Sequence, residues 1–243
     1  MNGKHTGGDF EPDENEHEPE WTFISDIFQR DDPIFRNMLF LEGCDLCSNT
    51  FIIVGDYLTV IDPGNDFTAF KDLFEHPEYD PADIKKIVLT SGLPHHAIGT
   101  IELFRYPSVK NNPGLEIIIH SSGPQKLKEM IRRFDVRLTE IKGGETLDLG
   151  GFPLKVIHTP GYTREAICLY HAPSRTLISG DTALSGAMAA PDEQAGGADQ
   201  YLASLRSLLQ LEIENILPGH GLPVAATSKK VIEDCYLAML QRV

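Results

Sequence analysis

The segment at residues 86–104 constrains the fold of this chain most, because a strand pattern, a short loop and a helix pattern follow one another there. Residues 86–90 form a short apolar run rich in β-branched side chains, which predicts a buried strand. Residues 97–104 place apolar side chains at helical spacing. The loop between these two segments contains the adjacent His95 and His96. A loop that joins a strand end to a helix start is a usual place for a functional site, so the sequence predicts a site here.

Five sequence blocks together resemble the signature of the metallo-β-lactamase superfamily. Residues 90–99 (TSGLPHHAIG) fit the family frame T-H-x-H-x-D-H-x-x-G without gaps, although not every ligand is kept. The other blocks are residues 59–64 (TVIDPG), 158–163 (HTPGYT), 179–182 (SGDT) and 217–221 (LPGHG). The resemblance covers roughly residue 49 to the C-terminus. It implies an α/β fold, the four-layer αββα sandwich, in which helices cover two mixed sheets and the site lies in loops at one edge.

The departures from the family pattern are confined to one of its two metal sites. In the family, the first site takes the two histidines of H-x-H and the histidine after H-T-P-G, and here these positions hold Ser91, Leu93 and Tyr162. The second site takes the D-H pair, the G-D aspartate and the P-G-H-G histidine, and here these positions hold His95, His96, Asp181 and His220. The resemblance therefore implies that only the second set can still bind a metal.

The ligand residues are replaced in only one of the two metal sites. Random mutation of an unused site would be expected to replace ligands of both, so the pattern implies that a single metal ion is retained. Three imidazoles and one carboxylate suit Zn²⁺, and also Fe or Mn. If all four side chains bind zinc, the site is closed and structural, whereas with three ligands a water completes it and can be activated near neutral pH. His95 is longer than the aspartate it replaces, so its ring either reaches the metal or overshoots it.

Tyr162 stands at a lost ligand position, so we expect its hydroxyl to point into the emptied first site. There it donates to a bound oxyanion, reaches the metal or fills the void with its ring. Together with Leu93, it predicts a partly apolar, repacked cavity. Turn chemistry accounts for Asp62, which precedes Pro and Gly at the end of a strand pattern. His158 precedes its turn and is expected either to orient a metal ligand or to pack.

Three classes of function are compatible with these residues. The leading hypothesis is an enzyme, a metal-dependent hydrolase with one metal ion that acts on a small thioester, ester or lactone. Asp181 would hold the metal and orient the attacking water, and Tyr162 is the second catalytic candidate. The alternatives are a mononuclear iron protein for oxygen binding or oxidation, and a metal-free pseudoenzyme scaffold. The fold by itself does not choose among them.

Composition and charge indicate which kinds of molecule this chain can bind. The formal net charge of -15 and a pI near 4.9 exclude nucleic acid as a favourable partner, because no basic stripe offsets phosphate repulsion. No apolar run is long enough to span a bilayer. A small-molecule substrate is the expected partner, and the sequence leaves room for a homodimer. With 41% hydrophobic residues, we expect one domain at residues 21–243 behind a flexible acidic tail at residues 1–20.

The four cysteines predict an intracellular chain, expected to be cytoplasmic, because they are few and no signal peptide is recognised. Cys44 and Cys47 have C-x-x-C spacing, which suits half a zinc site or a redox pair, but no second C-x-x-C exists. Cys168 and Cys235 have the sequence surroundings of small core residues.

The remaining elements are predicted from periodicity and turn residues. Helices are expected at residues 67–74, 124–134, 201–209 and 228–243, and strands at residues 116–120, 145–149 and 154–157. Residues 23–28 and 38–41 are expected to form strands, or a strand and a helical turn. Residues 183–197 are small and flexible in composition, and are expected to form a lid or a pocket wall.

Overall fold

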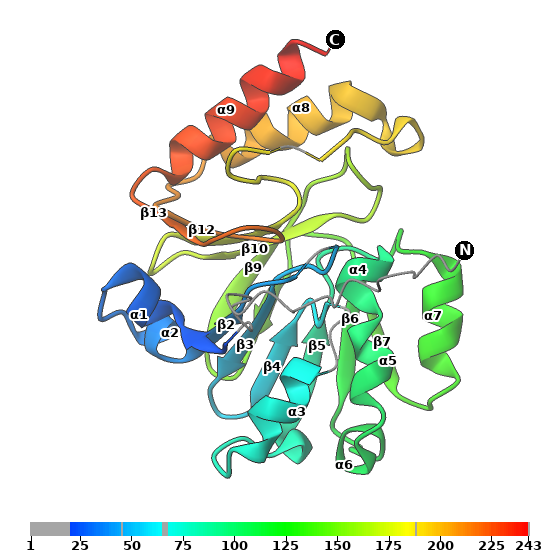
Figure 1. Ribbon diagram of the computed structural model, residues 1–243. Coiled ribbons are helices and arrows are strands. Elements are labelled where there is room, and N and C mark those ends of the chain that lie inside the picture. Colours follow the sequence, from blue (N-terminus) through cyan, green and yellow to red (C-terminus); the bar gives the residue numbers. More distant parts are fainter. Residues whose placement is uncertain (1–19, 45, 65–67, 188, 243) are drawn as a thin grey trace, which may run out of the picture.

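Two β-sheets face each other, and helices cover the outer face of each sheet (Figure 1). The structure is a computed structural model that describes residues 20–44, 46–64, 68–187 and 189–242. The predicted tail therefore lies outside the described residues, except for Glu20, and so does Phe67 of the predicted helix at residues 67–74.

Each sheet is mixed. The first has the strand order β1-β2-β3-β4-β5-β6-β7, and the second has the order β13-β12-β11-β10-β9-β8. The strands of the first sheet are β1 (Thr22–Phe23), β2 (Met38–Leu41), β3 (Thr50–Val54), β4 (Leu58–Ile61), β5 (Ile84–Val88), β6 (Glu116–His120) and β7 (Arg137–Ile141). Those of the second are β8 (Thr146–Asp148), β9 (Pro153–His158), β10 (Ile167–His171), β11 (Thr176–Gly180), β12 (Asn215–Pro218) and β13 (Val224–Ala225).

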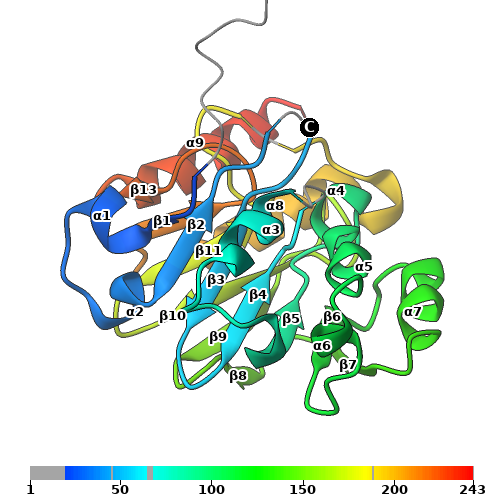
Figure 2. The same cartoon turned by 60° about the horizontal axis from the view of Figure 1, so that its bottom comes forward.

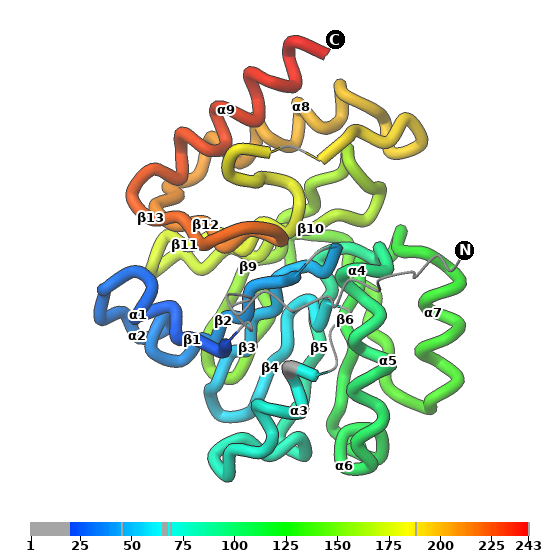
Figure 3. The backbone as a smooth tube through the Cα atoms, in the orientation of Figure 1, coloured from blue at the N-terminus to red at the C-terminus, as the bar shows by residue number. Residues whose placement is uncertain are grey.

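Most helices cover the two outer faces (Figure 1). The α-helices are α1 (Ile24–Phe28), α2 (Pro33–Arg36), α3 (Thr68–Glu75), α4 (Pro94–Ala97), α5 (Gly99–Leu103), α6 (Pro107–Lys110), α7 (Gln125–Arg132), α8 (Gly197–Leu208) and α9 (Ser228–Leu240). Two short 3₁₀ helices are η1 (Pro81–Asp83) and η2 (Glu193–Ala195). Helices α3 to α7 lie over the first sheet (Figure 2), and α8 and α9 lie side by side over the second (Figure 3). In contrast, α1 and α2 lie at one edge of the sandwich and pack against the layer between the sheets (Figure 1). Among the described residues, no helix combines the length and apolarity needed to cross a membrane.

Alternating side chains on the strands build separate apolar layers. In β6, Ile118 packs in the layer between the sheets, whereas Ile117 and Ile119 pack under the helices of the first sheet. In β10, Leu169 faces the layer between the sheets and Cys168 faces α8 and α9. This period of two is what a strand buried on both faces requires. The predicted αββα sandwich is therefore confirmed.

The helix after β5 begins earlier than the sequence pattern predicts. It starts at Pro94, the residue type that suits the first helical position because its missing N–H would have no partner there. The helix ends after one turn and α5 follows from Gly99, so His95 and His96 lie on a short helix and not in an open loop.

The sheet topology brings the ends of two pairs of parallel strands to one edge. Strand β4 is parallel to β5 in the first sheet, and β11 is parallel to β12 in the second. The carboxyl ends of parallel strands meet at the same edge of a sheet, which is where open α/β sheets place ligands. Asp62 follows β4, and Asp181 follows β11. The fold thus places the residues after these strands along one edge of the sandwich.

Candidate metal centre

The structure brings all four predicted metal ligands together. One ligand atom from each of His95, His96, Asp181 and His220 lies within 4.8 Å of the others. Their elements come from both halves of the sandwich: the two adjacent histidines lie on α4 after β5, and the other two residues follow β11 and β12. The cluster therefore joins the two sheets.

Asp181 is the centre of this cluster. Its Oδ2 lies 3.4 Å from His95 Nε2 and 3.2 Å from His96 Nε2, and its Oδ1 lies 3.6 Å from His220 Nε2. Burial acts to raise the pKa of Asp181, but hydrogen bonds from His95 and His96 and the nearby histidine charges lower it below its usual range. Asp181 is therefore ionised. Its Oδ1 is buried and has no hydrogen-bond partner.

Asp62 orients His96 through the second ring nitrogen. The Asp62 Oδ2 lies 2.9 Å from His96 Nδ1, and its Oδ1 accepts a hydrogen bond from the Thr90 N–H at 2.7 Å. The Thr90 hydroxyl also donates to Asp62. Burial acts to lower the pKa of the fully buried His96, but the charges of Asp62 and Asp181 and their hydrogen bonds outweigh it and raise that pKa to about 10.

Turn chemistry alone had accounted for Asp62, so sequence reasoning missed this part of its role. The signal that could have found it is chemical, because a buried metal-binding imidazole needs a hydrogen-bond acceptor for its other N–H. Asp62 adopts a φ of 49°, which is left-handed for a residue other than glycine. Asn and Asp tolerate that conformation better than most residues, so the turn and the pairing with His96 are compatible.

The loop that carries His220 approaches the cluster closely because Gly219 has no side chain. A Cβ at this position would lie 2.3 Å from Asp181 Oδ1 and 3.1 Å from His96 Cε1. Asn49, which the sequence interpretation also missed, holds the same loop: its Nδ2 donates to Pro218 O at 2.9 Å and to Gly221 O at 2.7 Å. These contacts fix His220 at the edge of the second sheet.

Tyr162 lies where the lost first-site ligand stood in the family pattern. Its side chain is 6% exposed and packs in one apolar cluster with Tyr201, while Leu93 is partly buried against the same cluster. This arrangement agrees with the predicted repacked cavity. The Tyr162 hydroxyl is buried, and among the described residues no hydrogen bond of full geometry reaches it, although an interaction with Ser91 acts to lower its pKa. Burial and the charge of Asp181 raise the pKa of Tyr162 well above its usual value, so the hydroxyl stays protonated and can donate.

His158 has no place in the cluster. Its Nε2 donates to Arg164 O at 2.8 Å, and its ring stacks on His120 with centroids 3.9 Å apart. Of the two roles expected for His158, packing is the one that these contacts support.

The cysteines divide as the sequence indicates. Cys168 and Cys235 are buried in the layer under α8 and α9. Burial raises the pKa of the Cys168 thiol to about 11. The Cys47 N–H donates to Cys44 O at 2.8 Å, which closes a turn. Within the described residues, neither of these two cysteines belongs to a group of three or more side chains that could hold a metal.

The residues of the cluster fit one divalent cation. Three imidazoles and one ionised carboxylate are ligands of Zn²⁺ and also of Fe or Mn. The orphaned Asp181 Oδ1 is a buried acceptor that a cation would satisfy. Two of the rings, His95 and His220, are 29% and 32% exposed, so the cluster is reachable from their side. The buried His96 closes the opposite side.

Comparison with known proteins identifies the family. The family model of the metallo-beta-lactamase superfamily matches residues 43–220, so the chain belongs to this superfamily. The probable metallo-hydrolase MJ0888 of Methanocaldococcus jannaschii is 29% identical over 202 residues, which cover 76% of this chain and 92% of that protein.

Two further comparisons describe its relatives. Acyl-coenzyme A thioesterase MBLAC2 of Gallus gallus is 33% identical over 84 residues, 33% of this chain and 30% of that protein. Three curated relatives, this thioesterase among them, are matched over only 38%, 51% and 30% of their own length. The crystal structure of the metallo-beta-lactamase family protein TTHA1429 from Thermus thermophilus has the same fold, with a TM-score of 0.64 at 18% identity. That match covers 85% of this chain and 80% of the other.

Proposed function

We propose that this chain is a metal-dependent hydrolase that holds one metal ion and acts on a small thioester, with esters and lactones as related substrates. The observation that carries the proposal is a pair of buried polar atoms, Asp181 Oδ1 and the Tyr162 hydroxyl, for which the described residues supply no hydrogen bond of full geometry. An unsatisfied buried polar group costs roughly 1–3 kcal/mol. A bound cation and a substrate oxygen would satisfy these two groups, one accepting and one donating.

The metal would be held by His96, Asp181 and His220, with His95 as the fourth ligand. A second ion is not proposed, because the other family site has Ser91, Leu93 and Tyr162 in place of its ligands. When bound, a zinc or iron ion supplies Lewis-acid polarisation of a carbonyl and lowers the pKa of water.

The remaining chemistry belongs to the side chains of this chain. The Tyr162 hydroxyl donates a hydrogen bond to the oxygen that becomes negative when the carbonyl is attacked, a position where one donor is typically worth about 10²–10³ in rate. Its raised pKa keeps the proton on Tyr162 throughout. Asp181, which is ionised, orients the attacking water. The substrate approaches from the side of the two partly exposed rings, His95 and His220.

The preference for a thioester rests on the relatives. A curated relative is named an acyl-coenzyme A thioesterase, and its match to this chain covers 33% of the chain. Hydrolysis of a thioester needs less help from a general acid than hydrolysis of an ester, because a thiolate is a better leaving group than an alkoxide. That suits a site in which the described acids, Asp181 and Asp62, are both engaged by histidines.

The test uses protein expressed without a histidine tag. We expect elemental analysis to find about one equivalent of zinc or iron in the wild type and none in a His96→Ala/His220→Ala variant. The metal-loaded wild type should release thiol from an acyl thioester, followed with a thiol reagent, and the variant should not. Absence of metal from the wild type would contradict the proposal and leave the pseudoenzyme. Stoichiometric iron with a visible absorption band and no hydrolysis of thioester, ester or lactone would replace it with the oxygen-binding alternative.

A further inference from the structure

An open pocket is lined by the same loop that carries Tyr162, and we propose that it binds an anionic group of the substrate, a phosphate or a carboxylate, through Arg164. The inference rests on the proposed hydrolase, because it assigns the part of the substrate that is held while the carbonyl reacts. The binding itself does not depend on hydrolysis, so it can be tested separately.

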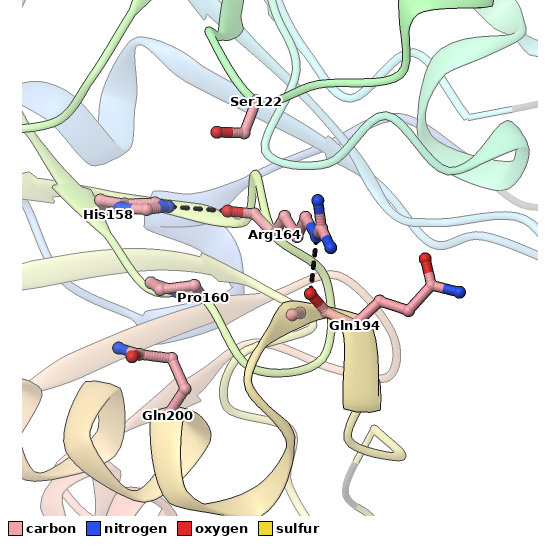
Figure 4. A pocket seen from close by; sticks show the side chains of 7 residues that line it. Ser122, His158, Pro160, Arg164, Gln194 and Gln200 are labelled. Carbon is pink, nitrogen blue, oxygen red and sulfur yellow. Dashed lines mark hydrogen bonds between the residues drawn. The ribbon is translucent and has the colours of Figure 1, made fainter.

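The lining of this pocket is unusual for so acidic a chain. Its volume is about 400 Å³, and its polar side chains are Ser122, His158, Arg164, Gln194 and Gln200 (Figure 4). The chain has 36 acidic residues against 21 Lys and Arg. Within the described part of the chain, no carboxylate lines the pocket, whereas a guanidinium, an imidazole and three neutral polar groups do. A hollow with this lining favours an anion over a cation, because a guanidinium and three neutral side chains that can donate hydrogen bonds line it, and its imidazole already donates to Arg164 O.

Arg164 is held so that part of its guanidinium remains available. Its Nε donates to Gln194 O at 2.6 Å. Among the described residues, no carboxylate forms an ion pair with Arg164. Figure 4 shows the side chain at the centre of the pocket with its two terminal nitrogens beyond the Nε contact. A planar guanidinium with free terminal N–H groups matches the geometry of a carboxylate or a phosphate.

The backbone around Arg164 is fixed before any ligand binds. His158 Nε2 donates to Arg164 O at 2.8 Å, and the His158 ring stacks on His120 at an interplanar angle of 15°. On the other side, the Gln194 N–H donates to Asp192 Oδ1 at 2.9 Å, and the Asp192 N–H donates to Gly161 O at 2.8 Å. A pocket that is already ordered loses less conformational entropy when it binds a ligand.

One loop connects this pocket to the metal centre. In residues 158–165, Tyr162 is buried in the electrostatic field of Asp181, whereas Arg164 is exposed and lines the pocket. The next residue, Glu165, turns inward again, and its Oε1 accepts a hydrogen bond from the Gly92 N–H at 3.1 Å. The loop therefore presents Tyr162 to the reacting group and Arg164 to a charged group further along the same substrate.

The first experiment compares three thioesters that share one acyl group. The thiol is coenzyme A, which carries phosphates, glutathione, which carries carboxylates, or N-acetylcysteamine, which is uncharged. We expect Arg164→Gln to raise KM about tenfold for a thioester whose anion the pocket binds, with kcat unchanged, because one charge-assisted hydrogen bond is lost. KM for the uncharged thioester should stay the same. Arg164→Lys, which keeps the charge, should restore part of the affinity.

Arg133→Gln is the matched control, because Arg133 is exposed at the end of α7, outside the pocket, and the variant loses the same charge. An Arg164 effect confined to the coenzyme A thioester supports a phosphate, and one confined to the glutathione thioester supports a carboxylate. An effect on both supports a general anion site. Equal effects on all three thioesters, no effect on any, or the same effect from Arg133→Gln would overturn the inference.

A binding experiment separates this inference from the proposed function. If the metal-loaded protein hydrolyses none of the thioesters, the hydrolase is wrong, and the pocket is then tested by calorimetric titration with coenzyme A and with glutathione. Binding of either thiol that is weakened about tenfold by Arg164→Gln, and not by Arg133→Gln, supports the anion site. No binding, or binding that Arg164→Gln leaves unchanged, overturns it.

Discussion

Asp62 determines how His96 can bind a metal, although it would not itself be a ligand. Its Oδ2 accepts from His96 Nδ1 at 2.9 Å, which leaves His96 Nε2 to face Asp181 and the metal. We expect Asp62→Asn to weaken metal binding about 10–100-fold, the usual cost of losing a partner that orients a ligand. The Asn side chain can still accept from the Thr90 N–H, so the turn should survive. Competition with a chromogenic chelator measures the affinity, with the exposed Asp26→Asn as control, and equal affinities would contradict this role.

Metal binding should also displace a proton from His96. The pKa of His96 in the metal-free protein is about 10, so the ring is protonated at neutral pH. A metal needs the lone pair of its Nε2, so one proton must leave, and affinity should rise about tenfold per pH unit between neutrality and that pKa. Burial lowers the pKa of His220, so that ring is already neutral and releases none. Calorimetry in buffers of different ionisation enthalpy counts the protons, and a count of zero near neutral pH would refute this account.

Tyr162→Phe separates stability from activity. Among the described residues, no hydrogen bond of full geometry satisfies the Tyr162 hydroxyl, which has only a weaker interaction with Ser91, so its removal should leave the free energy of unfolding unchanged or raise it by about 1 kcal/mol. The same change should lower kcat about 10²–10³-fold if the hydroxyl donates to the oxyanion. Tyr201→Phe is the contrast, because the Tyr201 hydroxyl donates to Asp181 O and Thr182 O. It should lower stability in urea unfolding. A Tyr162→Phe protein with full activity would leave Tyr162 as a space-filling residue.

At the scale of elements, one side chain ties the loop of His220 to the segment before β3. Asn49 is fully buried, donates to Pro218 O and Gly221 O, and accepts from the Gly43 N–H at 2.9 Å. We expect Asn49→Ala to lower the free energy of unfolding by about 2 to 4 kcal/mol, because it leaves buried backbone groups without partners. It should also weaken metal binding, since His220 loses its support. Urea unfolding checks the first effect, with Asn111→Ala, at an exposed residue, as control, and a change under about 0.5 kcal/mol would contradict it.

Strong apolar patterns predicted their elements well, and weak ones did not. Strand β6 lies where the apolar run at residues 116–120 places it, because both of its faces are buried. Strand β7 was not predicted, since its sequence RLTEI has only two apolar residues, three positions apart, and only Ile141 is buried. For residues 23–28 and 38–41 the sequence left open two strands or a strand and a helical turn, and the structure has the second: α1 covers most of the first segment and β2 the second. The aromatic and β-branched residues of the first segment suit either state, and packing decides between them.

The site was predictable as a set of ligands but not as a network. The family frame identified His95, His96, Asp181 and His220, because spacing along the sequence carries that information. The supporting contacts of the site join residues that are far apart in the sequence. Asp62 binds the Thr90 N–H, 28 positions away, and Asn49 binds Pro218 O, 169 positions away. Turn chemistry gave Asp62 a sufficient local explanation, and no motif in the sequence drew attention to Asn49. Their roles depend on which strand ends the fold brings together, and a local pattern does not contain that.

Over the whole molecule, the cluster lies where the two sheets are connected to each other. The Ile167 N–H of β10 donates to Thr90 O at 2.9 Å, and Asn49 N–H donates to Gly219 O at 2.7 Å, so backbone bonds already cross from one sheet to the other around it. The four candidate metal ligands come from both sides of this junction. A metal bound by all four would stabilise the contact between the two halves of the sandwich, and separating the halves would require its loss.

This arrangement predicts that the metal contributes directly to thermal stability. With free metal at about 100 times the dissociation constant, linkage adds about 2.7 kcal/mol to the free energy of unfolding. For a chain of this size, we expect the melting temperature to rise by about 5 to 10 °C. Differential scanning calorimetry at fixed pH, with and without metal, measures the shift. The His96→Ala/His220→Ala variant should show none of it. A metal that binds the wild type and leaves its melting temperature unchanged would mean that the unfolded chain binds it as tightly as the folded cluster does, and would contradict a site that the fold assembles.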